Sequence, residues 1–186
     1  MEKLRAFDTP TVCNALEIVD PGRRAVGFTT RPFVTAFPAM APVVGYAKTA
    51  VIRARERPKA DPAEVRAMRL RYYEYVAAPP VPSLVVIEDR DPEPGYGAFW
   101  GEVNTALHKG LGVLGCITSG SIRDLDLIAT DFQLLAGSVA PSHAGCMSRM
   151  STWRSRYTAC GSGRATCCTP TGTGPWSSPP TLWRRC

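Results

Sequence analysis

The sequence predicts a single α/β domain, and three observations support this prediction. Segments with helical signals alternate with segments rich in β-branched residues along residues 1–144. Alternation of this kind is typical of helices packed on a mostly parallel sheet. The chain has 186 residues, which is enough for one domain with a substantial core. Its hydrophobic fraction of 45% and charged fraction of 20% are ordinary for a globular protein.

The first half of the domain contains two predicted helices and one predicted strand. Thr9 and Pro10 are typical of an N-cap and a first-turn proline, and they predict a helix through TVCNALEIV. The many β-branched residues of 42–54 predict a strand. Asp61 and Glu64 form a capping pattern, so the following segment VRAMRLRYYEYVA is expected to be helical.

The second half continues the alternation with shorter elements. Short apolar runs bounded by glycine and proline indicate buried strands, and longer mixed runs indicate helices. The predicted elements are a strand (82–89), a loop (91–97), a helix (98–111), a strand (112–118), a short helix (122–130) and a strand (132–140).

Charge and hydropathy argue against membrane and nucleic-acid partners. No apolar run approaches the length of a membrane span, and the N-terminus does not resemble a secretory signal, so we expect a cytoplasmic protein. All 16 acidic residues and 16 of the 22 basic residues precede residue 145, so the net charge of +6 comes from the C-terminal segment alone. We find no basic stripe with interleaved aromatic residues of the kind that binds nucleic acid.

Residues 145–186 differ in composition from the rest of the chain. They hold five of the seven cysteines, three of the four tryptophans and no acidic residue, Val, Ile or Phe. One interpretation is a disordered tail rich in Ser, Thr, Gly and Pro. A metal or disulfide site is the alternative, but the cysteine spacing matches no zinc pattern and a reducing cytoplasm disfavours disulfides.

A shifted reading frame explains the composition of this tail better. If each codon starts one base earlier, with G or C at the free position, residues 146–157 become Val-His-Val-Ala-Asp-Val-Asp-Val-Glu-Val-Pro-Val. That pattern is close to the alternation of a half-buried strand. Under the same shift, residues 165–180 become Gly-Asp-Leu-Leu-His-Ala-Asp-Arg-His-Gly-Ala-Leu-Val-Ile-Pro-Pro. We therefore predict a frameshift near Ala144 or Gly145, which makes 145–186 an aberrant and poorly ordered tail.

Arg123 and Asp124 are candidate functional residues because they follow a predicted strand and the small residues 118–121. Ligand groups in α/β sheets collect beyond the carboxyl ends of the strands. Arg123 suits bidentate binding of an anion, and Asp124 suits a hard divalent cation, held directly or through water. A helix cap or a surface ion pair is the alternative for an isolated Arg-Asp pair.

The second candidate segment comprises Gly101, Glu102, Val103 and Asn104. If the preceding loop delivers free backbone N–H groups at a helix N-terminus, this segment would bind a carboxylate or phosphate. The alternative is a plain exposed helix face. The only two histidines, His108 and His143, lack metal-spaced partners, and we interpret them as structural.

The segment GEVNTALHKGLGVLGCITSGSIRDLD resembles the RraA-like proteins. That family includes the regulator of ribonuclease activity A and the class II 4-hydroxy-4-methyl-2-oxoglutarate aldolases. Its pattern is Gly-[Glu/Asp]-x-x, a helix, and a strand ending in Asp-Gly-x-x-Arg-Asp. Residues 101–104 match the first part, and residues 119–124 resemble the second part except at Ser119. TPTVCNALE and VVGYAKTA look like the family's first helix and first core strand. The frame-restored tail also looks like the family's ending.

The resemblance implies a compact α/β/β/α fold, of the swivelling-domain type, assembled as a homotrimer or a hexamer. It implies a metal-dependent lyase that cleaves a 4-hydroxy-2-oxo acid to pyruvate through an enolate, with oxaloacetate decarboxylation as a side activity. By the same resemblance, Arg123 and Glu102 are catalytic, Asp124 holds Mg²⁺ or Mn²⁺, and Arg123 and residues 101–104 bind the small 2-oxo acid.

The sequence departs from the family pattern at two positions, and two functions other than the lyase are open. Ser119 stands where the family often has Asp, and Asn104 stands where Leu is common. The first alternative is a non-catalytic binding protein like the ribonuclease regulator, and the second is a family member inactivated by its shifted tail. Retention of Glu102, Arg123 and Asp124 favours the enzyme.

Overall fold

The structure is a computed structural model. It describes residues 1–26, 28–29, 31–56, 59–143 and 145, and the backbone alone of 151–153, 157–162 and 165–170. Its helices are α1 (Glu2–Arg5), α2 (Thr9–Val19), α3 (Pro62–Ala77) and α4 (Glu102–Gly110), with 3-10 turns η1 (Pro21–Arg23) and η2 (Leu125–Leu127). Its strands are β1 (Val34–Thr35), β2 (Val43–Ile52), β3 (Ser83–Asp89), β4 (Ala98–Trp100), β5 (Val113–Ile122), β6 (Gln133–Val139), β7 (Ser151–Trp153), β8 (Tyr157–Ser162) and β9 (Ala165–Pro170).

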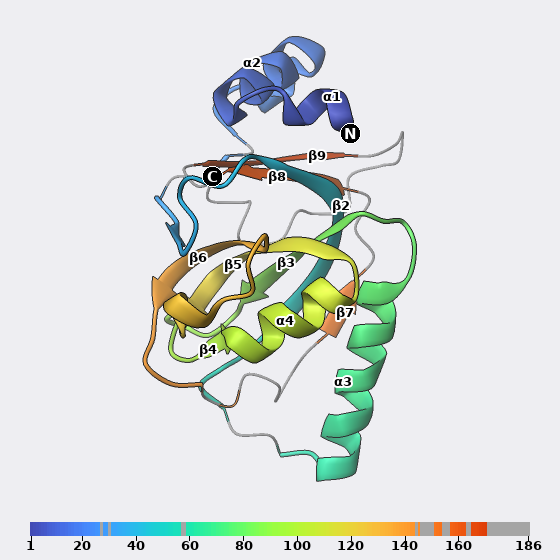
Figure 1. The fold of residues 1–186 in the computed structure, drawn as a ribbon, viewed down its shortest axis with the longest axis vertical. Coiled ribbons are helices and arrows are strands. Elements are labelled where there is room, and N and C mark those ends of the chain that lie inside the picture. Colours follow the sequence, from blue (N-terminus) through green and yellow to red (C-terminus); the bar gives the residue numbers. More distant parts are fainter. Residues whose placement is uncertain are drawn as a thin grey trace.

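The strands join in one sheet with the order β1-β6-β5-β3-β2-β8-β9, and β4 and β7 pair with β5 and β2. The central strands β2, β3, β5 and β6 are parallel, and β1, β7, β8 and β9 pair antiparallel. In Figure 1, α1 and α2 lie over β8 and β9, and α4 and α3 lie beyond β3, β5 and β6 on the other side. The predicted α/β class, with helices on two sides of the strands, is therefore confirmed.

The central strands are buried on both faces, which is why β3 has no exposed residue. One apolar cluster lies on the side of α3 and α4 and contains Tyr72, Trp100 and Phe132. A second cluster, with Leu84 and Leu135, packs on the opposite face. Among the helices that the structure describes, none is long and apolar enough to cross a membrane.

The helix starts show which local signals were decisive. Asp61 caps α3 as predicted, because its Oδ1 accepts a hydrogen bond from the N–H of Ala63 at 2.7 Å. The cap of α2 was wrongly predicted at Thr9. The N-cap is Asp8, whose Oδ1 accepts from the N–H of Thr11 at 3.0 Å, and Thr9 is buried inside the first turn.

The predicted helix over 98–111 was wrong at its start. Residues Ala98–Trp100 form strand β4, because Phe99 and Trp100 are buried and Trp100 pairs with Ile122 of β5. The helix itself begins only after Gly101. An apolar aromatic pair suits either structure in isolation, and its partner strand decided the outcome.

The segment after the predicted strand 112–118 also differs from expectation. Strand β5 continues to Ile122, where Ser121 and Ile122 pair with β6, so the small residues 118–121 lie in the sheet and not in an open loop. The predicted helix over 122–130 is only the three-residue turn η2. Asp124 has a left-handed backbone (φ 55°, ψ 43°), which is incompatible with an α-helix that continues from β5.

For the C-terminal segment, the structure describes Gly145 and the backbone of three strands. β8 pairs antiparallel with β2 and with β9, and β7 pairs with β2. The remaining residues of 145–186 lie outside the described part of the chain. The frameshift and the aberrant tail therefore stay predictions.

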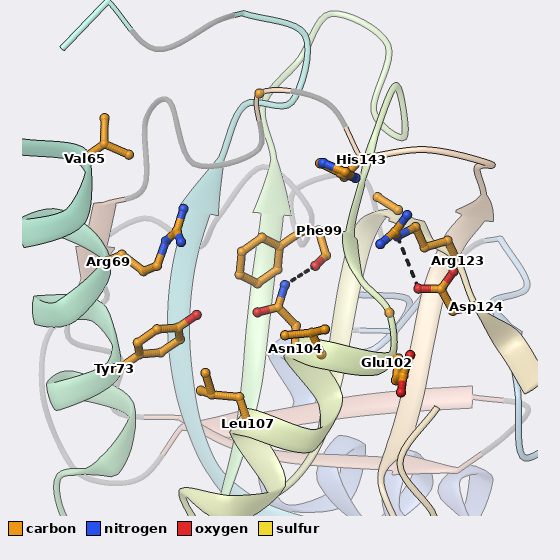
Figure 2. Close-up of a pocket in the computed structure, with 14 residues that line it drawn as sticks. Val65, Arg69, Tyr73, Phe99, Glu102, Asn104, Leu107, Arg123, Asp124 and His143 are labelled. Carbon is orange, nitrogen blue, oxygen red and sulfur yellow. Dashed lines mark hydrogen bonds and ion pairs between the residues drawn. The ribbon is translucent and has the colours of Figure 1, made fainter. Parts of the chain in front are cut away.

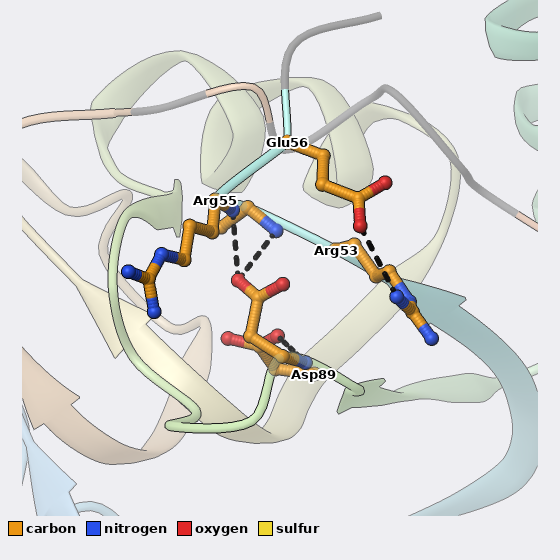
Figure 3. A network of polar contacts seen from close by, with 6 residues as sticks. Arg53, Arg55, Glu56 and Asp89 are labelled. Carbon is orange, nitrogen blue, oxygen red and sulfur yellow. Dashed lines mark hydrogen bonds and ion pairs between the residues drawn. The ribbon is translucent and has the colours of Figure 1, made fainter.

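Buried carboxylates hold the turn that follows β3 (Figure 3). Asp91 Oδ2 accepts hydrogen bonds from the N–H groups of Ala54 at 2.9 Å and Arg55 at 2.8 Å. Asp89 accepts from the N–H groups of Asp91 at 3.0 Å and Gly95 at 2.8 Å. Burial raises the pKa of Asp89, and these two N–H groups oppose that shift. The turn leads into β4 and so helps to position the site described below.

Replacing Asp91 with alanine should lower the free energy of unfolding by about 1–3 kcal/mol. The reason is that Ala54, which is fully buried, would keep an N–H group without an acceptor. Urea denaturation measures the change. The control is Glu93→Ala, an exposed carboxylate in the same turn, which should change stability by less than about 0.5 kcal/mol. Equal losses in both variants would contradict this role for Asp91.

Candidate functional site

A cavity of about 600 Å³ lies between α3 and α4 and reaches β4 and the end of β5 (Figure 2). All six residues singled out from the sequence line it, namely Gly101, Glu102, Val103, Asn104, Arg123 and Asp124. The fold therefore brings the two candidate segments together at one place. Their chemical roles stay predictions, since proximity alone assigns none.

The N-terminus of α4 supplies unpaired backbone donors to this cavity. Gly101 is the N-cap, and its carbonyl accepts the first intrahelical hydrogen bond from the N–H of Thr105 at 3.0 Å. The N–H groups of 102–104 precede that bond, so they have no partner within the helix. Together with the helix dipole they form a positive end that favours an anion.

Gly101 is needed for space and not for its backbone conformation. Its φ of −169° is extended and open to any residue. A Cβ at this position, however, would lie 2.6 Å from Asp124 Oδ2 and 3.1 Å from Arg123 Cγ. The missing side chain lets the carboxylate of Asp124 lie directly against the start of α4.

Arg123 and Asp124 form an ion pair, with Arg123 Nε 3.2 Å from Asp124 Oδ2. Successive side chains of a strand point to opposite faces, yet both of these residues line the cavity. The left-handed backbone of Asp124 ends that alternation. The N–H of Arg123 donates to the carbonyl of Trp100 at 3.0 Å, which ties the pair to β4. About a third of each side chain is exposed, so the pair is open to a ligand.

Asn104 and Glu102 contribute in different ways. The Asn104 side chain donates from Nδ2 to the carbonyl of Phe99, so it fastens α4 to β4 and leaves the backbone N–H for a ligand. Glu102 is exposed and lies beside Arg123 and Asp124 in Figure 2. Within the described part of the chain, no ion pair involves Glu102.

Sequence reasoning missed one whole wall of the cavity, which α3 provides. Val65, Arg69 and Tyr73 are four residues apart, so they share one face of that helix and line the cavity. The spacing was visible in the sequence, but no local signal says which helix face meets a cavity. His143 also lines the cavity and is exposed, although we interpreted it as structural.

His108, by contrast, is structural as predicted. It is fully buried, with Nε2 2.8 Å from the Tyr72 hydroxyl and Nδ1 2.6 Å from the carbonyl of Asn104. Because a carbonyl only accepts, Nδ1 carries the proton and Nε2 accepts from Tyr72. Burial lowers the pKa of His108 to about 4, and the hydrogen bond to Asn104 partly opposes the shift. The neutral imidazole therefore stays buried and donates a hydrogen bond to the carbonyl of Asn104, in the first turn of α4.

The buried histidine makes stability depend on pH in a defined window. The ordinary pKa is 6.5 and the folded value is about 4, so the unfolded chain gains a proton first as pH falls. The stabilisation from neutral His108 is complete above pH 6.5 and is lost as pH falls to about 4, a change of about 3 kcal/mol. Urea denaturation across this range should therefore show a flatter pH dependence for His108→Gln than for the wild type. The exposed control His143→Gln should keep the wild-type slope, and an unchanged slope in His108→Gln would contradict the prediction.

A resident metal would find few protein ligands here. Among the described residues, no group of three or more His, Cys, Asp or Glu side chains could hold a metal ion. Mg²⁺ commonly uses only one or two carboxylates and completes its shell with water and substrate oxygens. Asp124 fits that mode as a single carboxylate ligand, because it lines the cavity and is partly exposed.

Free helix-terminal N–H groups, an arginine and a carboxylate around one cavity define an α/β protein suited to binding a small anion. The comparison with known families is more specific. The chain belongs to the RraA-like family, because the family model described as Aldolase/RraA matches residues 9–152. Among curated proteins, none matches this chain in sequence.

Solved structures with the same fold include three of low sequence identity. Streptomyces coelicolor RraAS2, an unusual member of the RNase ES inhibitor RraA family, has TM-score 0.65 and 15% identity over 91% of this chain and 84% of its own. A protein described among novel cellulases from gut-associated microbes has TM-score 0.64 and 17% identity over 90% and 75%. The RNA-processing inhibitor RraA from Thermus thermophilis has TM-score 0.59 and 13% identity over 88% and 94%. Likeness at this identity shows the fold alone.

Proposed function

We propose that this protein is a divalent-metal-dependent lyase that cleaves a 4-hydroxy-2-oxo acid and releases pyruvate. The observation that carries the proposal is the meeting of the α4 N-terminus, Arg123 and Asp124 around one cavity. The family includes aldolases, and the retention of Glu102, Arg123 and Asp124 in this sequence favours that branch. Substrates of the class of 4-hydroxy-4-methyl-2-oxoglutarate are small anions, which suits the positive helix end.

Each group of this site has a proposed role in binding. The N–H groups of 102–104 bind the carboxylate next to the 2-oxo group, and Arg123 binds the oxo acid through its guanidinium. Asp124 would hold Mg²⁺ or Mn²⁺, directly or through water. A divalent cation bound there would act as a Lewis acid toward the 2-oxo group.

The proposed reaction needs one proton acceptor besides these groups. In the cleavage, the bond between C3 and C4 breaks, its electron pair forms the enolate of pyruvate, and the 4-hydroxyl group becomes a carbonyl. Glu102 is the other carboxylate that lines the cavity, so it is the candidate to accept the hydroxyl proton. The enolate then takes a proton at C3 to give pyruvate. Loss of CO₂ from oxaloacetate forms the same enolate, so one site serves both reactions.

The test is pyruvate release from 4-hydroxy-4-methyl-2-oxoglutarate and from oxaloacetate, with Mg²⁺ and with EDTA. Samples without protein correct for spontaneous loss of CO₂ from oxaloacetate. We expect release that needs both protein and metal. Release that persists in EDTA, or no release from a chain with an intact C-terminus, would count against the lyase.

A second candidate is a non-catalytic binding protein. Two of the structural neighbours are described as an RNA-processing inhibitor and as a member of an RNase inhibitor family, which favours this alternative. The same assay separates the two, because a regulator would release no pyruvate. In either case we propose a homotrimer or hexamer when the C-terminus is intact, with no nucleic-acid or membrane partner.

A further inference from the structure

The wall of the cavity that α3 provides carries a cation for which the proposed reaction has no use. Arg69 lines the cavity from α3, and Figure 2 places it across the cavity from Arg123 and Asp124. Arg123 is paired with Asp124. Among the residues that the structure describes, no ion pair or hydrogen bond involves Arg69. The cavity therefore has a second positive point, away from the start of α4.

Tyr73 adds a neutral donor beside Arg69, one helical turn further along α3. Its half-buried ring packs edge-on against His108, with ring centroids 5.8 Å apart. Burial raises the pKa of Tyr73, and the nearby charge of Arg69 partly offsets this shift. The hydroxyl group therefore keeps its proton at neutral pH and donates a hydrogen bond. An arginine with an adjacent hydroxyl is a suitable pair for a carboxylate.

The helix that carries this pair is firmly attached to the sheet. Lys48 of β2 is buried, and its Nζ donates to the carbonyls of Ala78 at 2.5 Å and Pro79 at 3.2 Å, at the C-terminal end of α3. The N–H of Thr49 donates to the Tyr75 hydroxyl at 3.0 Å. These bonds fix α3 relative to β2, so its side chains face the cavity from a rigid support.

The cavity is also larger than a three-carbon oxo acid requires. Pyruvate has six non-hydrogen atoms, and at no more than about 30 Å³ for each atom it fills at most about a third of the cavity volume. The volume of about 600 Å³ leaves room for a longer substrate that spans from Arg123 to the α3 wall. A second charged group on such a substrate would meet Arg69.

We propose that Arg69, assisted by Tyr73, binds the carboxylate of the substrate that is distal from the 2-oxo group. Arg69 is then the residue that selects dicarboxylic 4-hydroxy-2-oxo acids over monocarboxylic ones. This inference rests on the proposed function, because it assumes that the 2-oxo end binds at Arg123 and α4. It assigns Arg69 a role in specificity and none in bond cleavage.

A binding experiment on the full chain tests the assignment without requiring turnover. The probes are 2-oxoglutarate and 2-oxopentanoate, which differ in whether the end remote from the oxo group is a carboxylate or a methyl group. Calorimetric titration with Mg²⁺ present compares the wild type with Arg69→Gln. We expect Arg69→Gln to weaken 2-oxoglutarate about tenfold to 100-fold and to leave 2-oxopentanoate unchanged within about twofold.

Two further variants serve as controls. Arg71→Gln removes an exposed arginine from another face of α3, so it should bind both probes like the wild type. Tyr73→Phe should weaken 2-oxoglutarate by about threefold to tenfold, since it removes one neutral hydrogen bond. Circular dichroism confirms that each variant keeps its helices.

The possible outcomes separate this inference from the proposed function. Equal weakening of both probes by Arg69→Gln, no weakening at all, or the same effect from Arg71→Gln would overturn the role of Arg69 and leave the lyase standing. Failure of the wild type to bind either probe would overturn the proposed site and this inference with it. In a catalytically competent chain, kcat/KM for 4-hydroxy-2-oxoglutarate should fall in Arg69→Gln, mainly through KM, while that for 4-hydroxy-2-oxopentanoate stays constant.

Discussion

Replacing Asp124 with alanine is expected to abolish metal-dependent pyruvate release and to leave the protein folded. Asp124 is the carboxylate that lies against the start of α4 and pairs with Arg123. Without it, the proposed cation loses its protein ligand and Arg123 loses the partner that orients it. Loss of one preorganised electrostatic group commonly lowers kcat by about 100-fold to 1,000-fold. The measurement is the rate of pyruvate release at saturating Mg²⁺ in the frame-restored chain with and without the substitution, with circular dichroism and urea denaturation on the same samples.

Substitutions at Asp124 can separate the effect of its charge from the effect of its backbone conformation. Its left-handed backbone (φ 55°) is unfavourable for most residues but tolerated by asparagine and glycine. Asp124→Asn should therefore fold like the wild type and still lose turnover, and Asp124→Gly should be at least as stable as the wild type while inactive. The control is Asp126→Asn, an exposed carboxylate of η2 that should keep full turnover. Unchanged turnover in Asp124→Asn would remove Asp124 from the site.

Sequencing of the coding DNA across codons 135–186 is expected to reveal a one-base insertion or deletion near codon 145. The composition of the tail motivates this prediction, because a one-base shift restores alternating apolar residues in 146–157. The family model matches residues 9–152 and leaves residues 153–186 unmatched. A clean open frame, without an indel relative to the natural gene, would refute the frameshift.

The frame-restored chain and the printed chain should then differ in assembly and activity. We expect the restored chain to form a trimer or a dimer of trimers and to release pyruvate with Mg²⁺. The printed chain should assemble poorly and show weak or no release, because the predicted frameshift replaces the residues of the family's last strands. Size-exclusion chromatography with light scattering measures assembly, and the pyruvate assay measures turnover. Equal assembly and turnover of the two chains would contradict an effect of the tail.

Much of the fold follows from local signals, and the errors have a common cause. The start of α3 was predictable because Asp61 caps its own helix through a neighbouring N–H group. Strand β2 was predictable from its β-branched residues. Strand β4 was not predictable from local signals, since its pairing partner in β5 lies some twenty residues further along the chain. The left-handed Asp124, which replaces the predicted helix by a short turn, was equally hidden because its conformation depends on the surroundings.

From the amino-acid sequence alone we could predict the α/β alternation and two short segments whose residue types suggest an anion site and a cation site. The resemblance to the RraA-like family was also visible in the sequence. The meeting of residues 101–104 with Arg123 and Asp124, with no side chain on Gly101 to separate them, depends on contacts between distant segments and became visible in the folded protein. The same holds for Arg69 and Tyr73 of α3, which face the same cavity. A helix carries several faces of similar composition, and the face that meets a cavity depends on how the helix docks on the sheet.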